Sequence, residues 1–474
     1  MILSEPRVPR GGQRASTPST RVPGPRQGTA VLKAGFAPPA DHDRALAKGH
    51  QWSWAIVLLV LGAACYNAVL AFLNARGLTM QKSDVVLAEI ALLSTGGLLI
   101  LACGPRRGDT APAALGAFFV LDALIVSMLG NSIFVDMARN AAIIAVFMML
   151  GSRISERDLH RCFMLAAIAV AAVLLLEMAS VEKYASWFAP ADYFAQTRGI
   201  AKEAFDQLGL FGNSLGFDSR FAIVTLMDHR ACSLFLEQVS LANFGVILVI
   251  LLACDWNRLS LLSKGVFAAL AVLIILTTNS RLALGLTLMT PVACLLTLRW
   301  NRFLTLLVMP ATLLGAAVIG ANATAAADDL PGRLEKTVKV LGSLDIDAIS
   351  GLEVLKAPIF ADSGYAYVIY ASTILGMLVL WLFVSLVASQ SQPRVMRCSL
   401  LLNLYVFSSL TISGNSVFSI KTAALLWLLV GHVRGEALTR EAGTNSLLDS
   451  NKFRGQRGRM SFAGCSPSLI ADSS

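Results

Sequence analysis

The chain has 474 residues, of which 55% are hydrophobic and only 15% are charged, and its mean hydropathy is +0.65. Soluble globular domains are far more polar, so this composition excludes a soluble fold and predicts an all-α, polytopic membrane protein. The net charge of +9 comes largely from the ends of the chain and the short loops, where we expect it to face an anionic membrane surface and not nucleic acid.

Both ends of the chain differ from the rest. Residues 1–50 are rich in Pro, Gly, Ser and Arg and contain eight Lys or Arg against three acids, which predicts a disordered basic tail. Residues 434–474 have the same character. The first apolar run follows 50 polar residues and is long enough to span a bilayer, so we expect a membrane anchor and no cleaved signal peptide.

The segment between the two tails, residues 51–433, consists mainly of apolar runs. A bilayer core needs roughly 20 apolar residues per helix, and we count twelve runs, with ten or eleven as alternatives because some are short. They cover residues 52–73, 85–103, 112–130, 135–152, 162–180, 240–254, 264–279, 282–298, 303–320, 365–388, 399–413 and 417–433.

Basic residues in short loops indicate the orientation, because they concentrate on the cytoplasmic side. With the N-terminus inside, the inner loops contain eleven Lys or Arg and the short outer loops contain three, namely Arg76, Lys82 and Arg281. This predicts that both termini are cytoplasmic. It also leaves two long outer segments, residues 181–239 and 321–364, so we expect the function at the outer face.

Five charged residues fall inside the predicted spans: Glu89, Asp122, Asp136, Arg139 and Glu177. Each costs about 2.5 to 3.5 kcal/mol in lipid, so they must face the bundle or a wet cavity. Asp136 and Arg139 are three residues apart, which favours a mutual ion pair on one helix face. Glu177 lies near the outer end of its helix, where it meets either a loop arginine or a ligand.

The outer segment 181–239 has seven acids against five basic residues and closes with RACSLFLEQVS, which contains Glu237. Its arginines, Arg198, Arg220 and Arg230, lie on the face where basic residues are disfavoured, and an anionic ligand would explain them. Salt-bridged packing is the alternative. Arg198 and Gly209 form an R-x10-G spacing, which chance alone produces roughly one time in three.

Three further polar residues follow in chain order. Arg281, in the tight turn TTNSR, either snorkels and caps a helix or binds a phosphate at the membrane surface. Asp362, in ADSGY, either caps the following helix or offers a carboxylate that accepts a proton from a sugar hydroxyl. Lys421, at the start of the last span, is expected to be a snorkelling lysine.

The cysteines and histidines show no pattern typical of a metal site or of disulfide bonds. The eight cysteines lack CxxC spacing and lie mostly in apolar runs, and Cys232 alone is expected on the outer side. His229 is the only histidine expected there. We therefore predict no metal centre and no cofactor.

The order of these motifs resembles that of the Wzy-type polysaccharide polymerases, in the superfamily of O-antigen polymerases and ligases. The matching features are the closing motif RACSLFLEQVSLANF, the TTNSR turn, DSGY before a helix with glycine, and GNSVFSIKTAALLW. Repeat-unit polymerases of xanthan-like exopolysaccharides are the most similar. The resemblance covers roughly residues 50–433.

The resemblance implies a GT-C-like protein of the bacterial inner membrane that transfers a growing glycan from undecaprenyl pyrophosphate to the next lipid-linked repeat unit, at the periplasmic face. It implies Arg230 and Arg281 as pyrophosphate ligands and Asp362 at the position where the ligases carry a histidine. Arg198, Arg220 and Glu237 are the expected substrate-binding residues. A metal-independent glycosyltransferase is expected, with membrane lipid, a chain-length regulator and export machinery as further partners.

Two other functions stay open at this point. An O-antigen-type ligase shares the fold, although Asp362 in place of the histidine counts against it. A flippase for lipid-linked oligosaccharides belongs to another class, but transporters usually have internal repeats and short loops. No repeat is evident in this sequence.

Overall fold

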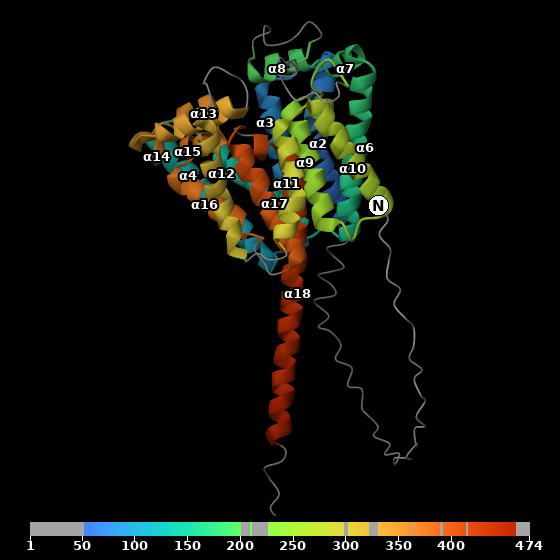
Figure 1. The fold of residues 1–474 in the computed structure, drawn as a ribbon, viewed down its shortest axis with the longest axis vertical. Coiled ribbons are helices and arrows are strands. Elements are labelled where there is room, and N and C mark those ends of the chain that lie inside the picture. The colour runs from blue at the N-terminus through green and yellow to red at the C-terminus, as the bar shows by residue number, and fades with distance from the viewer. Residues whose placement is uncertain are drawn as a thin grey trace, which may run out of the picture. The chain divides into compact units, whose positions relative to one another are not determined.

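The computed structural model describes residues 52–200, 209–210, 226–297, 302–321, 330–360, 362–388, 392–413 and 416–460, with the backbone alone after residue 441. Every regular element in these ranges is a helix (Figure 1), which confirms the all-α class for the described part. Of the two predicted tails, residues 1–51 and 461–474 lie outside the described residues. The last helix does not end at residue 433 as expected, because α18 (Ile420–Met460) continues well past it.

The helices follow the predicted apolar runs closely. The N-terminal half contains α2 (Ser53–Ala75), α3 (Lys82–Cys103), α4 (Thr110–Leu129), α5 (Asp136–Gly151), α6 (Glu156–Ala179), α7 (Val181–Phe188) and α8 (Pro190–Arg198). The C-terminal half contains α9 (Gln238–Asp255), α10 (Leu261–Thr278), α11 (Arg281–Leu296), α12 (Val308–Gly320), α13 (Leu330–Gly342), α14 (Ile346–Ser350), α15 (Gly364–Ala371), α16 (Ile374–Leu386) and α17 (Pro393–Leu410), followed by α18.

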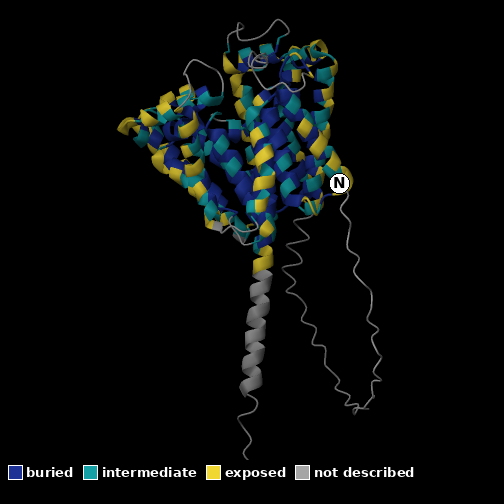
Figure 2. Ribbon diagram, viewed as in Figure 1, coloured by how far each residue is buried: buried dark blue, intermediate teal, exposed yellow. Residues whose placement is uncertain are grey.

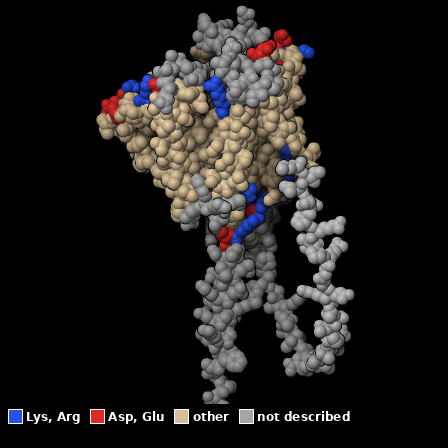
Figure 3. Space-filling view, viewed as in Figure 1, with Lys and Arg blue, Asp and Glu red and all other residues tan. Residues whose placement is uncertain are grey.

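The described helices make a membrane protein. Seven are long and apolar enough to cross a bilayer: α2, α3, α4, α6, α9, α10 and the segment Phe303–Gly320 that ends with α12. Large apolar side chains such as Leu101, Met128 and Leu295 are exposed on outward helix faces, while buried residues fill the interior (Figure 2). On the face drawn in Figure 3, charged residues gather toward the two ends and leave an uncharged belt between them. The predicted number of about twelve spans stays a prediction, because α5, α11 and α16 are shorter.

Helices α5 and α18 cross at very close range near the C-terminal end of α5. A Cβ atom added to Gly431 would lie 2.0 Å from the carbonyl oxygen of Met148, and one added to Gly151 would lie 2.2 Å from that of Leu428. Only glycine allows the two backbones to approach this closely. The crossing positions the N-terminal ends of α5 and α18 beside each other.

The predicted span 365–388 is two helices, not one. The chain breaks at Ser372 and Thr373, and the Thr373 side chain then caps α16 by accepting a hydrogen bond from the Gly376 amide. Gly351 packs against this break, where a Cβ would lie 2.7 Å from the Ser372 carbonyl oxygen. The segment between α14 and α15 therefore packs against the break between α15 and α16.

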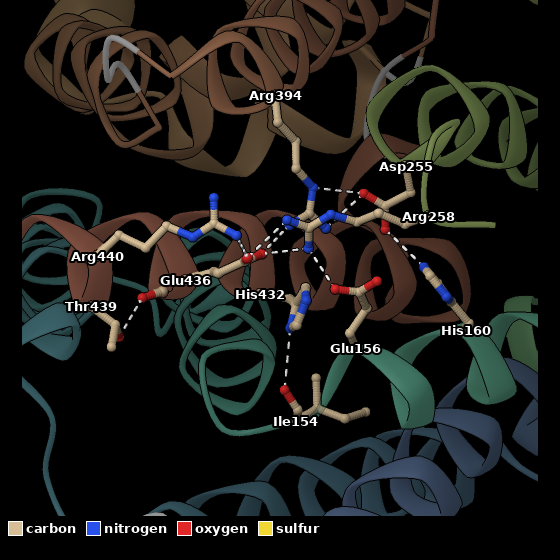
Figure 4. A network of polar contacts seen from close by, with 11 residues as sticks. Ile154, Glu156, His160, Asp255, Arg258, Arg394, His432, Glu436, Thr439 and Arg440 are labelled. Carbon is tan, nitrogen blue, oxygen red and sulfur yellow. Dashed lines mark hydrogen bonds and ion pairs between the residues drawn. The ribbon is translucent and has the colours of Figure 1, made fainter. Parts of the chain in front are cut away.

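An ion-pair network joins four helices at the end of the bundle opposite α7 and α8 (Figure 4). The Arg258 guanidinium donates to Glu156 at 2.5 Å and to Glu436 at 2.8 Å. Arg394 contacts Glu436 as well and donates from Nε to Asp255 at 2.7 Å. We call this end the lower end, and the end that carries α7 and α8 the upper end (Figure 1).

Candidate functional site

A cavity of about 620 Å³ opens at the upper end of the bundle. Its walls come from the upper halves of α2, α3 and α5, from α8, from the first turn of α9 and from the start of α18. The described residues that line it include four cations and four acids: Lys82, Arg139, Arg198, Lys421, Glu89, Asp136, Glu237 and Asp362. We call it the upper cavity.

Glu237 holds two of these cations together. It is the residue before α9, and its carboxylate forms an ion pair with the Arg198 guanidinium. The Lys421 ammonium donates to Glu237 Oε2 at 2.7 Å and to the Phe235 carbonyl oxygen at 3.2 Å. The Ser240 hydroxyl donates to the same carboxylate at 3.0 Å. Because two cations share one carboxylate, this cluster has a net positive charge.

The electrostatics of the cluster agree with its geometry. Burial alone would raise the pKa of the Glu237 carboxyl, but the charges of Lys421 and Arg198 outweigh burial and hold that pKa well below its ordinary value. Glu237 is therefore ionised at neutral pH. The same carboxylate raises the pKa of Arg198 against the opposing effect of burial, so both partners stay charged.

Aromatic residues of α8 position Arg198 at the cavity. The Tyr193 hydroxyl donates to Asn67 of α2 at 2.5 Å, which fixes α8 on the bundle. The Arg198 guanidinium lies over the Phe194 ring, 4.5 Å from its centroid. Gly209, which follows Arg198 in the R-x10-G spacing, has φ of +78° and accepts a hydrogen bond from the Ala191 amide, so its role in the described structure is to hold the start of α8.

A second ion pair lies deeper in the upper cavity and corrects a prediction. Arg139 does not pair with Asp136; its Nε donates to Glu89 of α3 at 2.7 Å. The Tyr66 hydroxyl donates to the same carboxylate at 2.6 Å. The i,i+3 rule failed because a better partner on a neighbouring helix was within reach.

Asp362 lies exposed at the upper cavity, just before α15. The capping alternative for it is wrong, because the residue before α15 is Ser363 and its side chain makes no capping hydrogen bond. The described structure thus brings Asp362 to the same cavity as Arg198 and Glu237.

Arg230 and Arg281 lie elsewhere, at the turn between α10 and α11. Arg230 is buried, and its Nε donates to the Thr278 carbonyl oxygen at 2.7 Å. Arg281 is the first residue of α11, directly after the cap residue Ser280. The closing motif meets the TTNSR turn, but neither arginine lines the upper cavity. Their role as pyrophosphate ligands stays a prediction. Arg220 lies outside the described residues.

Glu177, on α6, holds the closing motif against the bundle by accepting hydrogen bonds from its backbone. Its fully buried carboxylate accepts hydrogen bonds from the Ser233 amide at 2.7 Å and from the Cys232 amide at 3.1 Å. His229 lies 3.2 Å from the same carboxylate. Glu177 therefore meets backbone amides and a histidine, and not the loop arginine expected of it.

The sequence interpretation missed Lys421. It is 2% exposed and paired with Glu237, so the prediction of a snorkelling lysine is wrong. The sequence offered one signal for this ion pair. Lys421 is the second residue of an apolar helix, and Glu237 directly precedes another apolar helix. Many such pairs are possible, and only the fold selects this one.

Among the described residues, one group has the ligands and spacing for a metal ion, and it lies at the lower end. Glu156, His432 and Glu436 bring one ligand atom each to within 4.8 Å of one another. The Arg258 guanidinium already bridges the two carboxylates, and Arg394 contacts Glu436 too. A divalent cation would have to displace these guanidinium groups, so we assign the cluster a structural role.

Comparisons with protein-family models, with curated proteins and with solved structures find no match to this chain.

Proposed function

We propose that this protein is a membrane-embedded, metal-independent glycosyltransferase that polymerises oligosaccharide repeat units linked to undecaprenyl pyrophosphate, as its resemblance to the Wzy-type polymerases implies. The observation that carries the proposal is the upper cavity, where Arg198 and Lys421 share the single carboxylate of Glu237. A cluster in which two cations share one carboxylate, at the end of an apolar bundle, suits an anionic headgroup on a lipid chain.

The shape and lining of the upper cavity suit a lipid-linked sugar. Its volume of about 620 Å³ falls within the range of small-molecule sites, roughly 300 to 1,000 Å³. Of the ring residues that line it, Tyr66 is partly exposed and offers a surface against which a sugar can pack, whereas Tyr193 and Phe194 are buried. The Arg198 side chain is 43% exposed, so its guanidinium is accessible to a ligand even though it is paired.

Such a site needs little covalent chemistry of its own. Pyrophosphate is already a good leaving group, so the protein has to neutralise its developing charge and orient an acceptor hydroxyl. In the proposed reaction, Arg198 and Lys421 neutralise the pyrophosphate, and Arg230 and Arg281 at the neighbouring turn remain candidates for a second contact. Asp362 remains a candidate base at the mouth of the cavity.

We further propose a twelve-span arrangement in the bacterial inner membrane, with both termini cytoplasmic and the upper end periplasmic. Ser53 at the start of α2 and the middle of α18 both lie at the lower end, since Ser53 donates to Asp158 at 2.6 Å and His432 lies 3.2 Å from the Ile154 carbonyl oxygen. This placement supports an even number of spans. The basic residues at the lower end, among them Arg153, suit the cytoplasmic side.

The lipid-linked products of a strain that lacks the protein test the proposed function. We expect single repeat units to accumulate on the outer leaflet and polymer to disappear. Single units trapped on the inner leaflet would instead support a flippase, and unligated long chains would support a ligase.

Complementation of that strain with point variants tests the site. Arg198→Ala should abolish or strongly shorten the polymer while the protein still inserts. Arg76→Ala is the matched control, because Arg76 is an exposed arginine at the upper end that does not line the cavity. Polymer of normal length from Arg198→Ala would exclude this arginine from the site.

A further inference from the structure

The four acids of the upper cavity differ in what they contact. Glu89 accepts hydrogen bonds from Arg139 and Tyr66, and Glu237 is held by Arg198 and Lys421. These two carboxylates are occupied by their cations. The lone pairs that remain available in the cavity belong to the other two acids, Asp136 and Asp362, for which the described part of the chain provides no hydrogen bond or ion pair.

Asp136 is the better positioned of the two. It is the first residue of α5, the helix that packs most extensively against α18. One turn further along α5, Arg139 is held by Glu89 and Asn140 donates to the Tyr367 hydroxyl at 3.4 Å. Asp136 is therefore held by a rigid helix with fixed neighbours, as a reacting group must be. Asp362, by contrast, is exposed in a turn.

A carboxylate without a counter-ion inside a cavity that binds sugars has an evident chemical use. In inverting glycoside chemistry, a carboxylate accepts the proton of the attacking hydroxyl. Glu237 does not suit this task, because two cations compete for its lone pairs. Asp136 lines the same cavity and is free of that competition among the described residues.

We propose that Asp136 is the catalytic base that binds the acceptor sugar hydroxyl. This inference rests on the proposed function. The acceptor oxygen forms a bond to the anomeric carbon as the bond from that carbon to the pyrophosphate oxygen breaks. The bonding electrons leave with the pyrophosphate, which the Arg198 and Lys421 cations neutralise, and the hydroxyl proton passes to the Asp136 carboxylate. Solvent removes this proton before the next cycle.

The test separates donor binding from turnover in the purified full-length protein in nanodiscs. The probe is the lipid-pyrophosphate-linked repeat unit isolated from a strain that lacks the protein. Asp136→Asn should bind this unit within about 2-fold of wild type but lower the rate of polymerisation by about 100-fold or more, the typical contribution of a general base. Asp136→Glu should recover part of the rate.

Two controls make the result decisive. Asp347→Asn also changes an aspartate in the first turn of a helix, but Asp347 is exposed on α14 and does not line the cavity, so its rate should stay at the wild-type value. Asp362→Asn changes the other aspartate of the cavity and should lose less of the rate than Asp136→Asn does. The inference is overturned if Asp136→Asn polymerises at the wild-type rate, or if Asp362→Asn shows the larger loss. It is also overturned if Asp136→Asn loses donor binding to the same extent as turnover. A wild-type protein that binds the unit but makes no polymer would overturn the proposed function itself.

Discussion

Glu237, Arg198 and Lys421 come from three distant parts of the chain and are joined by two ion pairs. Lys421 is 2% exposed, so its ammonium exists there only because a carboxylate lies 2.7 Å away. The cluster is thus a stability element as well as a candidate binding site. Two measurements at this scale test the stability role.

Replacing Lys421 tests the stability role. Lys421→Met keeps much of the side-chain volume but leaves Glu237 with one cation fewer, and removing one partner of a buried pair costs roughly 3 kcal/mol. We expect a clearly lower melting temperature in detergent. Lys356→Met is the control, because the ion pair of Lys356 with Glu353 is on the surface and contributes little. Equal effects of the two variants would show that the Lys421 pair is not a buried one.

Glu237 also makes stability depend on pH. Its pKa is depressed in the folded protein by Lys421 and Arg198 in spite of burial. A carboxyl group of this kind stabilises the fold above its unfolded-state pKa, about 4.3 for glutamate, and the contribution is lost as the pH falls through the folded-state pKa. The difference in melting temperature between wild type and Glu237→Gln should therefore shrink as the pH is lowered from about 7 to about 3. A constant difference would mean that this carboxyl group does not titrate as inferred.

At the scale of elements, the closing motif is held by one side chain. Glu177→Gln leaves one oxygen to accept the backbone hydrogen bonds and turns an NH2 donor toward at least one of the Cys232 and Ser233 amides. A buried amide left without a partner costs about 1 to 3 kcal/mol, so hydrogen exchange of peptides that cover residues 226–237 should accelerate by about 10-fold or more. Glu182→Gln, on the exposed side of α7, should leave that exchange unchanged.

The crossing of α5 and α18 is the second test at this scale. Gly431→Ala places a methyl group 2.0 Å from the Met148 carbonyl oxygen, which forces the helices apart and should lower stability by about 3 kcal/mol. Gly285→Ala has open space around its Cβ position within α11 and should be neutral or slightly stabilising. Melting temperatures of the two alanine variants compare them directly. Similar values would argue against the close crossing.

Sequence patterns predicted the helices well and the contacts between them poorly. Apolar runs of spanning length identify helices because a bilayer imposes length and composition on each one separately. The fold determines which charged residues pair with each other. Arg139 pairs with Glu89 and not with the nearby Asp136, and Lys421 pairs with an acid 184 residues earlier in the chain. The sequence placed Arg198, Glu237 and Asp362 among the site residues. It could not show that they share one cavity, because that cavity is assembled from seven separate segments of the chain.

At the scale of the whole molecule, an apolar belt separates two charged ends that differ in structure. The lower end is closed by the guanidinium and carboxylate network around Arg258, which ties α6, α9, α17 and α18 together. The upper end instead leaves a cavity with charged walls. A bundle with an ion-pair network at its lower end and a cavity at its upper end suits chemistry on a lipid headgroup at a single membrane face.

The central claim is that the purified protein alone extends lipid-linked repeat units. The most direct measurement reconstitutes the wild-type protein and Arg198→Ala in liposomes with repeat units isolated from a strain that lacks the protein, without added metal or nucleotide, and separates the products by gel electrophoresis. We predict a ladder of lipid-linked polymers from the wild type and single units from Arg198→Ala. Single units from both proteins, with the wild type correctly inserted, would contradict the claim.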